Sequence, residues 1–131
     1  MDNILGVDYG RRKIGLAIAD AKAKLAMPLK VVRYEKFKEG IEKVSKVAEV
    51  SGVSKVVIGI SEGKMAEETK IFGRKLEEKL HIQIEFQDET LTTYEAQELS
   101  IKAGIKRKKR RLLEDAYSAA LILQEYLTSV H

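Results

Sequence analysis

The sequence contains no cysteine and only one proline, Pro28, among its 131 residues. Without cysteine, neither a disulfide framework nor a thiolate metal site can form. No apolar run is long enough to cross a bilayer, and the N-terminus lacks the basic and then apolar pattern of a secretory signal. These absences predict a cytoplasmic protein that does not contact membranes.

The composition is that of a globular domain with one concentrated patch of charge. Hydrophobic residues make up 44% of the chain and charged residues 34%, which fits a soluble protein rather than a disordered one. A length of 131 residues suits one domain with a sheet covered by helices. Of the 24 basic residues, six form the unbroken run 106–111, and the other 18 face 20 acidic residues. We therefore expect a basic patch beside a nearly neutral body.

Short apolar segments predict five strands. Residues 4–20 form two of them, joined by a basic turn that contains glycine, and residues 26–32 form a third. Pro28 favours an edge position or the start of its strand, because proline cannot donate a hydrogen bond to a neighbouring strand. The nearly continuous apolar run 55–60 is typical of a parallel strand covered on both faces, and residues 81–86 predict a strand after it.

Apolar residues at helical spacing separate the later strands. A helix is expected from about residue 35 to Gly52, and another over 65–80. Residues 92–95 fit a capping box, which opens a helix that ends at Gly104. Residues 112–127 are rich in Ala and Leu and predict a largely buried terminal helix. The order predicts an α/β fold whose mixed five-stranded sheet has three antiparallel and then two parallel strands, flanked by helices.

Three carboxylates that are far apart in sequence are candidates for one shared site. Asp8 stands in an apolar strand, where an unpaired carboxylate costs several kcal/mol, so it needs a basic side chain, a row of amides or a metal ion as its partner. Glu89 follows the last strand, and Asp115 lies in the first turn of the last predicted helix, on its apolar side. The predicted topology brings all three to one edge of the sheet.

The chemistry of such a cluster is that of a hard metal ion. Oxygen ligands without cysteine or histidine suit Mg²⁺ or Mn²⁺. Two such ions about 4 Å apart can activate a water and stabilise the leaving oxygen in phosphodiester hydrolysis. Each acid also has an ordinary interpretation: Asp8 as a turn former or ion-pair partner, Asp115 as a complement to the helix dipole, and Glu89 as a loop residue.

The three acids lie in motifs that resemble a known family. The motifs are GVDYGRRKIGLA at 6–17, DETLTT at 88–93 and DAYSAALILQ at 115–124. They resemble the YqgF/RuvX family of Holliday-junction-resolvase-like proteins, which have an RNase H-like fold and are described as candidate pre-16S rRNA nucleases. The resemblance covers essentially the whole chain, so it implies one nuclease domain of this type over 1–131.

The resemblance also implies an activity and its residues. It implies a metal-dependent endonuclease with Asp8, Glu89 and Asp115 as catalytic acids and as ligands of Mg²⁺ or Mn²⁺, acting in the cytoplasm on the 5′ end of small-subunit ribosomal RNA. Two features depart from the family: Thr90 stands where an arginine is usual, and residues 61–63 lack the expected Leu-Pro. In related resolvases a glutamate at that strand end completes the site, so Glu62 is a rival for the third place, and we prefer Glu89.

Basic and hydroxyl side chains near the acids are candidates for phosphate contacts. The run 106–111 directly precedes the helix of Asp115, although a solvated loop is the usual fate of such a run. Tyr9 and Tyr94 are candidates for stacking on bases, with core packing as the alternative. The candidate nucleic-acid-binding residues are Arg11, Arg12, Lys13, Thr92, Thr93, Lys106, Arg107, Lys108, Lys109, Arg110 and Arg111.

Several functions remain open at this point. A nuclease acting on structured RNA is preferred on the family resemblance alone. Resolution of DNA junctions is the alternative, and it requires a symmetric dimer because two strands are cut in concert. We leave monomer and homodimer open. A nucleic-acid-binding module without catalysis is a further alternative, and a sugar-kinase-like phosphotransferase is disfavoured because such folds need two domains of this kind.

Overall fold

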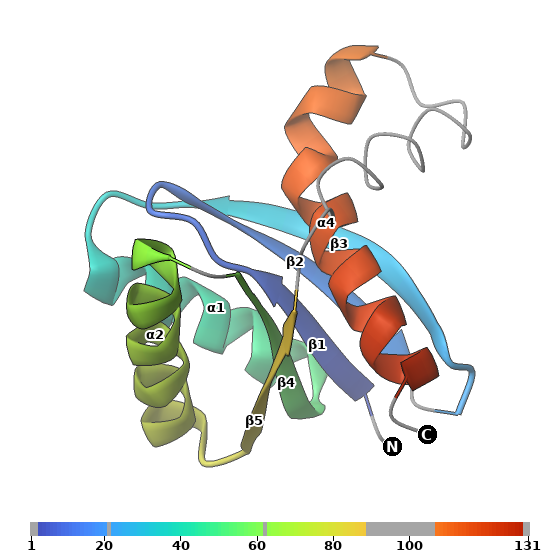
Figure 1. Ribbon diagram of the computed structural model, residues 1–131, viewed down its shortest axis with the longest axis horizontal. Helices are drawn as coiled ribbons and strands as arrows, with labels where there is room; N and C mark the ends of the chain where they lie inside the picture. Colours follow the sequence, from blue (N-terminus) through green and yellow to red (C-terminus); the bar gives the residue numbers. More distant parts are fainter. Residues whose placement is uncertain (1–2, 21, 62, 89–106, 130–131) are drawn as a thin grey trace.

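The computed structural model describes residues 3–20, 22–61, 63–88 and 107–129, and for 107–112 it describes the backbone. These residues form one sheet with helices on both faces (Figure 1). In chain order, the elements are β1 (Asn3–Asp8), β2 (Lys13–Asp20), β3 (Leu25–Arg33), α1 (Phe37–Ser51), β4 (Val53–Ile60), α2 (Lys64–Leu80), β5 (Gln83–Asp88) and α4 (Arg107–Ser129).

The sheet has the predicted mixed topology. Its strand order is β3-β2-β1-β4-β5. Strand β2 pairs antiparallel with both β1 and β3, whereas β4 and β5 run parallel to β1. Pro28 lies in the edge strand β3 beside a register shift, as its missing N–H group requires. Because β1, β4 and β5 run parallel, their carboxyl ends meet at one edge of the sheet, where Asp8 is the last residue of β1.

Each face of the sheet has its own core. Helices α1 and α2 cover one face, where Leu5 and Val7 of β1 are fully buried (Figure 1). Of the described helices, α4 covers the other face, where Ile4 packs against residues such as Leu123. Successive side chains of a strand point to opposite faces, so the even-numbered residues of β1 face α4.

The element boundaries follow the predictions with two corrections. Gly52 ends α1 in the left-handed conformation, with φ of 64°, whereas β5 lies about two residues later than predicted. Helix α4 begins at Arg107, not at 112, because Lys and Arg are good helix formers and no glycine or proline interrupts the run. Asp115 therefore lies in the third turn of α4 and not in the first, so complementing the helix dipole does not explain it. The predicted helix 92–104 lies outside the described residues.

Helix α4 is the longest helix among the described residues, at 23 residues. Neither α4 nor any other helix in this part of the chain combines the length and apolar character needed to span a membrane.

Candidate active site

Asp8 lies on the α4 face of the sheet. It follows Ile4 and Gly6 at the two-residue spacing that keeps side chains on one face of a strand. At Gly6 the helix comes into direct contact, because a Cβ added there would lie 2.8 Å from the Cβ of Leu123 and 2.9 Å from the carbonyl oxygen of Ala119. The next residue along β1 on that face is Asp8.

Asp115 is on the side of α4 that faces the sheet. Residues four apart on a helix lie above one another, so Asp115, Ala119 and Leu123 share one side. Ala119 and Leu123 are fully buried against the sheet, and Asp115, whose side chain is 27% exposed, is one turn nearer the N-terminus of α4. The prediction that Asp115 shares the apolar side of its helix is confirmed for Ala119 and Ile122, which are both fully buried.

Gly15 brings the two acids to the same place. It is the register partner of Asp8 across the β1–β2 pair. A Cβ added at Gly15 would lie 1.8 Å from the carbonyl oxygen of Asp115, so the backbone of α4 rests directly on β2 there. Asp8 and Asp115 thus flank one glycine, although 107 positions separate them in the chain. Glu89 and its rival Glu62 lie outside the described residues.

A lysine completes the described part of the site. Lys13 is two residues before Gly15 on the same face of β2, and its Nζ lies 3.1 Å from Oδ2 of Asp115. The sequence interpretation assigned Lys13 only a phosphate contact and missed this ion pair. The shared face of residues 13 and 15 was visible in the sequence, but the height at which α4 crosses them was not.

The donor set fits a hard divalent ion. Asp8 and Asp115 offer only oxygen ligands, as Mg²⁺ and Mn²⁺ prefer, and Asp115 already binds a cation in the form of the Lys13 ammonium. Within residues 3–20, 22–61, 63–88 and 107–129, no cluster of three acidic, histidine or cysteine side chains could hold a metal. Asp8 and Asp115 are thus the two candidate ligands among the described residues, and the two candidates for a third, Glu89 and Glu62, lie outside them.

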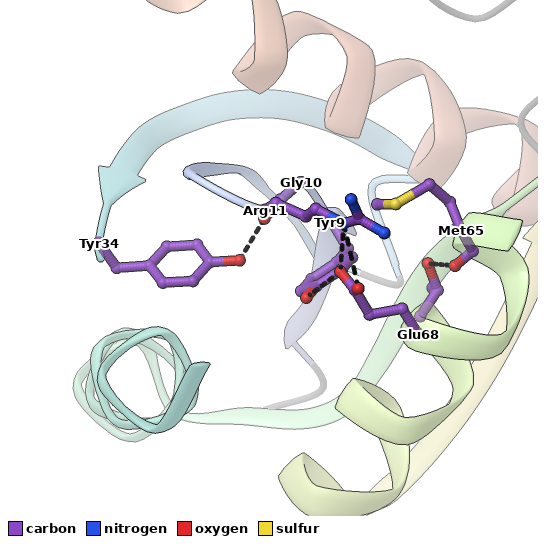
Figure 2. A network of polar contacts seen from close by, with 7 residues as sticks. Tyr9, Gly10, Arg11, Tyr34, Met65 and Glu68 are labelled. Carbon is purple, nitrogen blue, oxygen red and sulfur yellow. Dashed lines mark hydrogen bonds and ion pairs between the residues drawn. The ribbon is translucent and has the colours of Figure 1, made fainter. Parts of the chain in front are cut away.

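The turn that follows Asp8 is anchored to α2 and to Tyr34. The Tyr9 hydroxyl donates a hydrogen bond to Oε2 of Glu68 at 2.8 Å, and Nε of Arg11 donates to Oε1 of Glu68 at 3.1 Å (Figure 2). Tyr34 donates from its hydroxyl to the carbonyl of Gly10, and its backbone N–H donates to the carbonyl of Arg12 at 3.1 Å. These bonds fix the backbone between the strand of Asp8 and that of Lys13.

Tyr9 belongs to the core. It is 8% exposed, and its ring centroid lies 4.7 Å from that of Phe72. Burial, together with the neighbouring Tyr34 and Glu68, raises the pKa of Tyr9 above its usual value. The ring is therefore not offered to a nucleic-acid base, and core packing accounts for this tyrosine. Glu68 is a supporting residue that sequence reasoning missed, because nothing local marks a contact between residues 59 positions apart.

The proposed phosphate-binding residues have different surroundings. Arg11 and Arg12 are both exposed, and Arg11 forms an ion pair with Glu68. The backbone of 107–111 forms the first turns of α4, which extends beyond the sheet (Figure 1). Lys106, Thr92, Thr93 and Tyr94 lie outside the described residues.

Comparisons with known proteins find relatives that match nearly the whole chain. A family model described as "RuvX: Holliday junction resolvase" matches residues 2–129. A protein of Syntrophus aciditrophicus is 36% identical over 97% of this chain and 89% of its own. One of Endomicrobium trichonymphae is 37% identical over 97% of this chain and 96% of its own. Both are named "Putative pre-16S rRNA nuclease".

Solved structures show the same fold at low sequence identity. Thermus thermophilus RuvC in complex with a Holliday junction substrate has a TM-score of 0.65 at 15% identity and covers 97% of this chain and 94% of its own. The fowlpox virus resolvase with its substrate Holliday junction DNA has a TM-score of 0.68 at 14% identity, with 98% of each chain covered. The predicted RNase H-like fold is therefore confirmed, and by its sequence this chain belongs to the RuvX family.

Proposed function

We propose that this protein is a metal-dependent endonuclease that hydrolyses phosphodiester bonds in structured nucleic acid, with the 5′ end of precursor 16S ribosomal RNA as its substrate. The observation that carries the proposal is the meeting of Asp8 and Asp115 at Gly15, at the edge of the sheet where the parallel strands end. Two carboxylates on a fixed strand and a fixed helix can hold a cation without rearrangement. In this structure the cation next to Asp115 is the ammonium group of Lys13.

The roles follow from the positions of the side chains. Asp8, Asp115 and a third acid, Glu89 in preference to Glu62, would hold Mg²⁺ or Mn²⁺. When bound, such an ion supplies an activated water and stabilises the leaving oxygen. The chain itself holds Asp8 in position through the anchored turn and excludes solvent beneath the site through the fully buried Ala119.

Binding of the substrate rests on basic residues at both sides of the acids. Arg12 lies in the turn that follows the strand of Asp8, and residues 107–111 form the start of α4, the helix that carries Asp115. Lys106 precedes them in the sequence. Positive charge on both elements attracts the phosphate backbone and raises its local concentration at the acids. We assign RNA as the substrate on the names of the relatives and place the reaction in the cytoplasm.

Resolution of DNA junctions is the second candidate, and the description of the family supports it. The two candidates differ in a measurable property, because a resolvase needs a symmetric dimer to cut two strands in concert. A protein that remains monomeric when bound to a four-way junction contradicts junction resolution and leaves RNA processing standing.

The function is tested by cleavage assays on precursor RNA and on four-way DNA junctions, with Mg²⁺ or Mn²⁺. We expect the wild type to cut the RNA, and Asp8→Asn and Asp115→Asn to lower the rate at least ~100-fold, because a metal-activated step cannot proceed without its ligands. Glu125→Gln is the matched control, since Glu125 is exposed on the same helix as Asp115. Its rate is expected to equal that of the wild type.

The same assay decides the third acid and the class of function. Loss of cutting in Glu89→Gln but not in Glu62→Gln supports our assignment, and the reverse result overturns it. Full cutting by Asp115→Asn contradicts the proposed site. RNA binding without metal binding or cleavage in the wild type indicates a binding module and overturns the nuclease proposal.

A further inference from the structure

Lys13 occupies a position that the proposed function assigns to a metal ion. Its ammonium group lies 3.1 Å from Oδ2 of Asp115, at the distance of a direct ion pair. It is also the diagonal neighbour of Asp8 across the β1–β2 pair, because Asp8 is opposite Gly15 and Lys13 precedes Gly15 by two residues. The ammonium that pairs with Asp115 thus belongs to a residue next to Asp8 in the strand register.

The backbone of Lys13 is fixed, but its side chain can move. The carbonyls of Gly10 and Arg12 are both held by Tyr34, and β2 begins at Lys13 itself. The Lys13 side chain is 45% exposed, and its four-carbon stem leaves the ammonium free to turn toward solvent. An ion pair this exposed contributes little to stability, so its position in the site calls for another explanation.

We propose that Lys13 is a counter-ion that holds Asp115 until a divalent ion takes its place. This inference rests on the proposed function. The ammonium and a divalent ion compete for the same carboxylate oxygen and repel each other, so one must leave before the other binds. Lys13 keeps the two acids from repelling each other in the metal-free protein. Its displaced ammonium then remains at the mouth of the site, where it faces the phosphate of a bound nucleic acid.

The competition predicts a rise in metal affinity when the lysine is removed. A unit charge about 5 Å from a divalent ion in a largely solvated site changes the binding constant about tenfold. Lys13→Met keeps the apolar stem and removes the charge, so we expect it to bind Mn²⁺ about tenfold more tightly than the wild type. Arg12→Met is the matched control. Arg12 is next to Lys13 in the sequence, its side chain is exposed, and the substitution removes the same positive charge. We expect its affinity to change less than threefold.

The test is an Mn²⁺ titration of the full chain, followed by the electron paramagnetic resonance signal of the free ion. It is run on the wild type, Lys13→Met, Arg12→Met and Asp115→Asn. Thermal melting is the second readout: without metal Lys13→Met melts close to the wild type, and with Mn²⁺ it gains more than the wild type does.

The outcomes separate this inference from the function on which it rests. Tighter binding in Lys13→Met alone supports the counter-ion. Unchanged or weaker binding in Lys13→Met, with binding abolished in Asp115→Asn, overturns the counter-ion and leaves the metal site standing. Undiminished binding in Asp115→Asn contradicts the metal site itself. Equal tightening in Lys13→Met and Arg12→Met indicates general electrostatics and overturns the specific role of Lys13.

Discussion

Gly15 lies where β2 and α4 are in backbone contact, and a methyl group has no room there. A Cβ at this position would lie 1.8 Å from the carbonyl oxygen of Asp115. Gly15→Ala must therefore push α4 away from the sheet, and we expect it to lower the free energy of unfolding by about 3 kcal/mol. It also separates Asp115 from Asp8, so the cleavage rate falls further than the folded fraction does. Urea denaturation and cleavage assays measure the two effects.

Gly52→Ala provides the contrast for Gly15. Among the described residues, apart from its neighbours in the chain, no atom lies within 4 Å of a Cβ added at Gly52, so its φ of 64° alone makes alanine unfavourable. We expect a cost of about 1 kcal/mol and no change in the cleavage rate of the folded protein. Equal losses of stability in the two variants would show that the approach of α4 to Gly15 is not tight.

Tyr9 makes the stability of the protein sensitive to alkaline pH. Burial raises its pKa above the value of about 10 that it has in an unfolded chain. The folded state thus holds a proton that the unfolded state loses, so the free energy of unfolding falls as the pH rises past about 10, by up to about 1.4 kcal/mol per pH unit. In Tyr9→Phe this decline is expected to be shallower, though not absent, since the pKa of Tyr34 and Tyr126 is also raised by burial. Urea unfolding of both proteins between pH 9 and pH 11 measures this decline. The prediction is contradicted if the free energy of unfolding falls equally steeply with pH in the wild type and in Tyr9→Phe.

At the scale of elements, Phe72 joins α2 to the core that it shares with α1 and the sheet. This ring is fully buried and contacts both Tyr9 and Phe37, with centroids 4.7 and 6.2 Å away. Phe72→Ala leaves a cavity, so we expect a loss of about 4 kcal/mol in the free energy of unfolding. The neighbouring Ile71 is 45% exposed on the same helix, and Ile71→Ala is expected to cost under ~1 kcal/mol. A chemical-denaturation series in which both variants lose the same amount would contradict this anchoring role.

The strands and helices could be predicted from the sequence more completely than the contacts between them. Short apolar segments on either side of a basic turn were enough to predict β1 and β2, and the spacing of Asp115, Ala119 and Ile122 predicted the buried side of α4. The predicted start of α4 was wrong. The run of basic residues before residue 112 was interpreted as a loop, although lysine and arginine are good helix formers. The pairs Lys13–Asp115 and Tyr9–Glu68 depend on the height and angle at which helices cross the sheet, and a one-dimensional pattern carries no such information.

At the scale of the whole molecule, the charge of the run 106–111 is expected to govern binding of nucleic acid. Four of its residues, Lys106, Arg107, Lys109 and Arg110, can be changed to glutamine together. Each phosphate that the variant no longer neutralises reduces the slope of log affinity against log salt concentration by about 0.7 for single-stranded nucleic acid. Binding of RNA at several salt concentrations measures the slope, and an unchanged slope in the variant would contradict a phosphate-binding role.

Helix α4 both covers one face of the sheet, where it is the only helix among the described residues, and carries Asp115. Any movement that withdraws Asp115 from the proposed site therefore also opens the core beneath it. Loosening of α4 on heating should therefore unfold the protein and should not leave a folded but inactive form. We expect catalysis and the melting transition to disappear over the same narrow range of temperature.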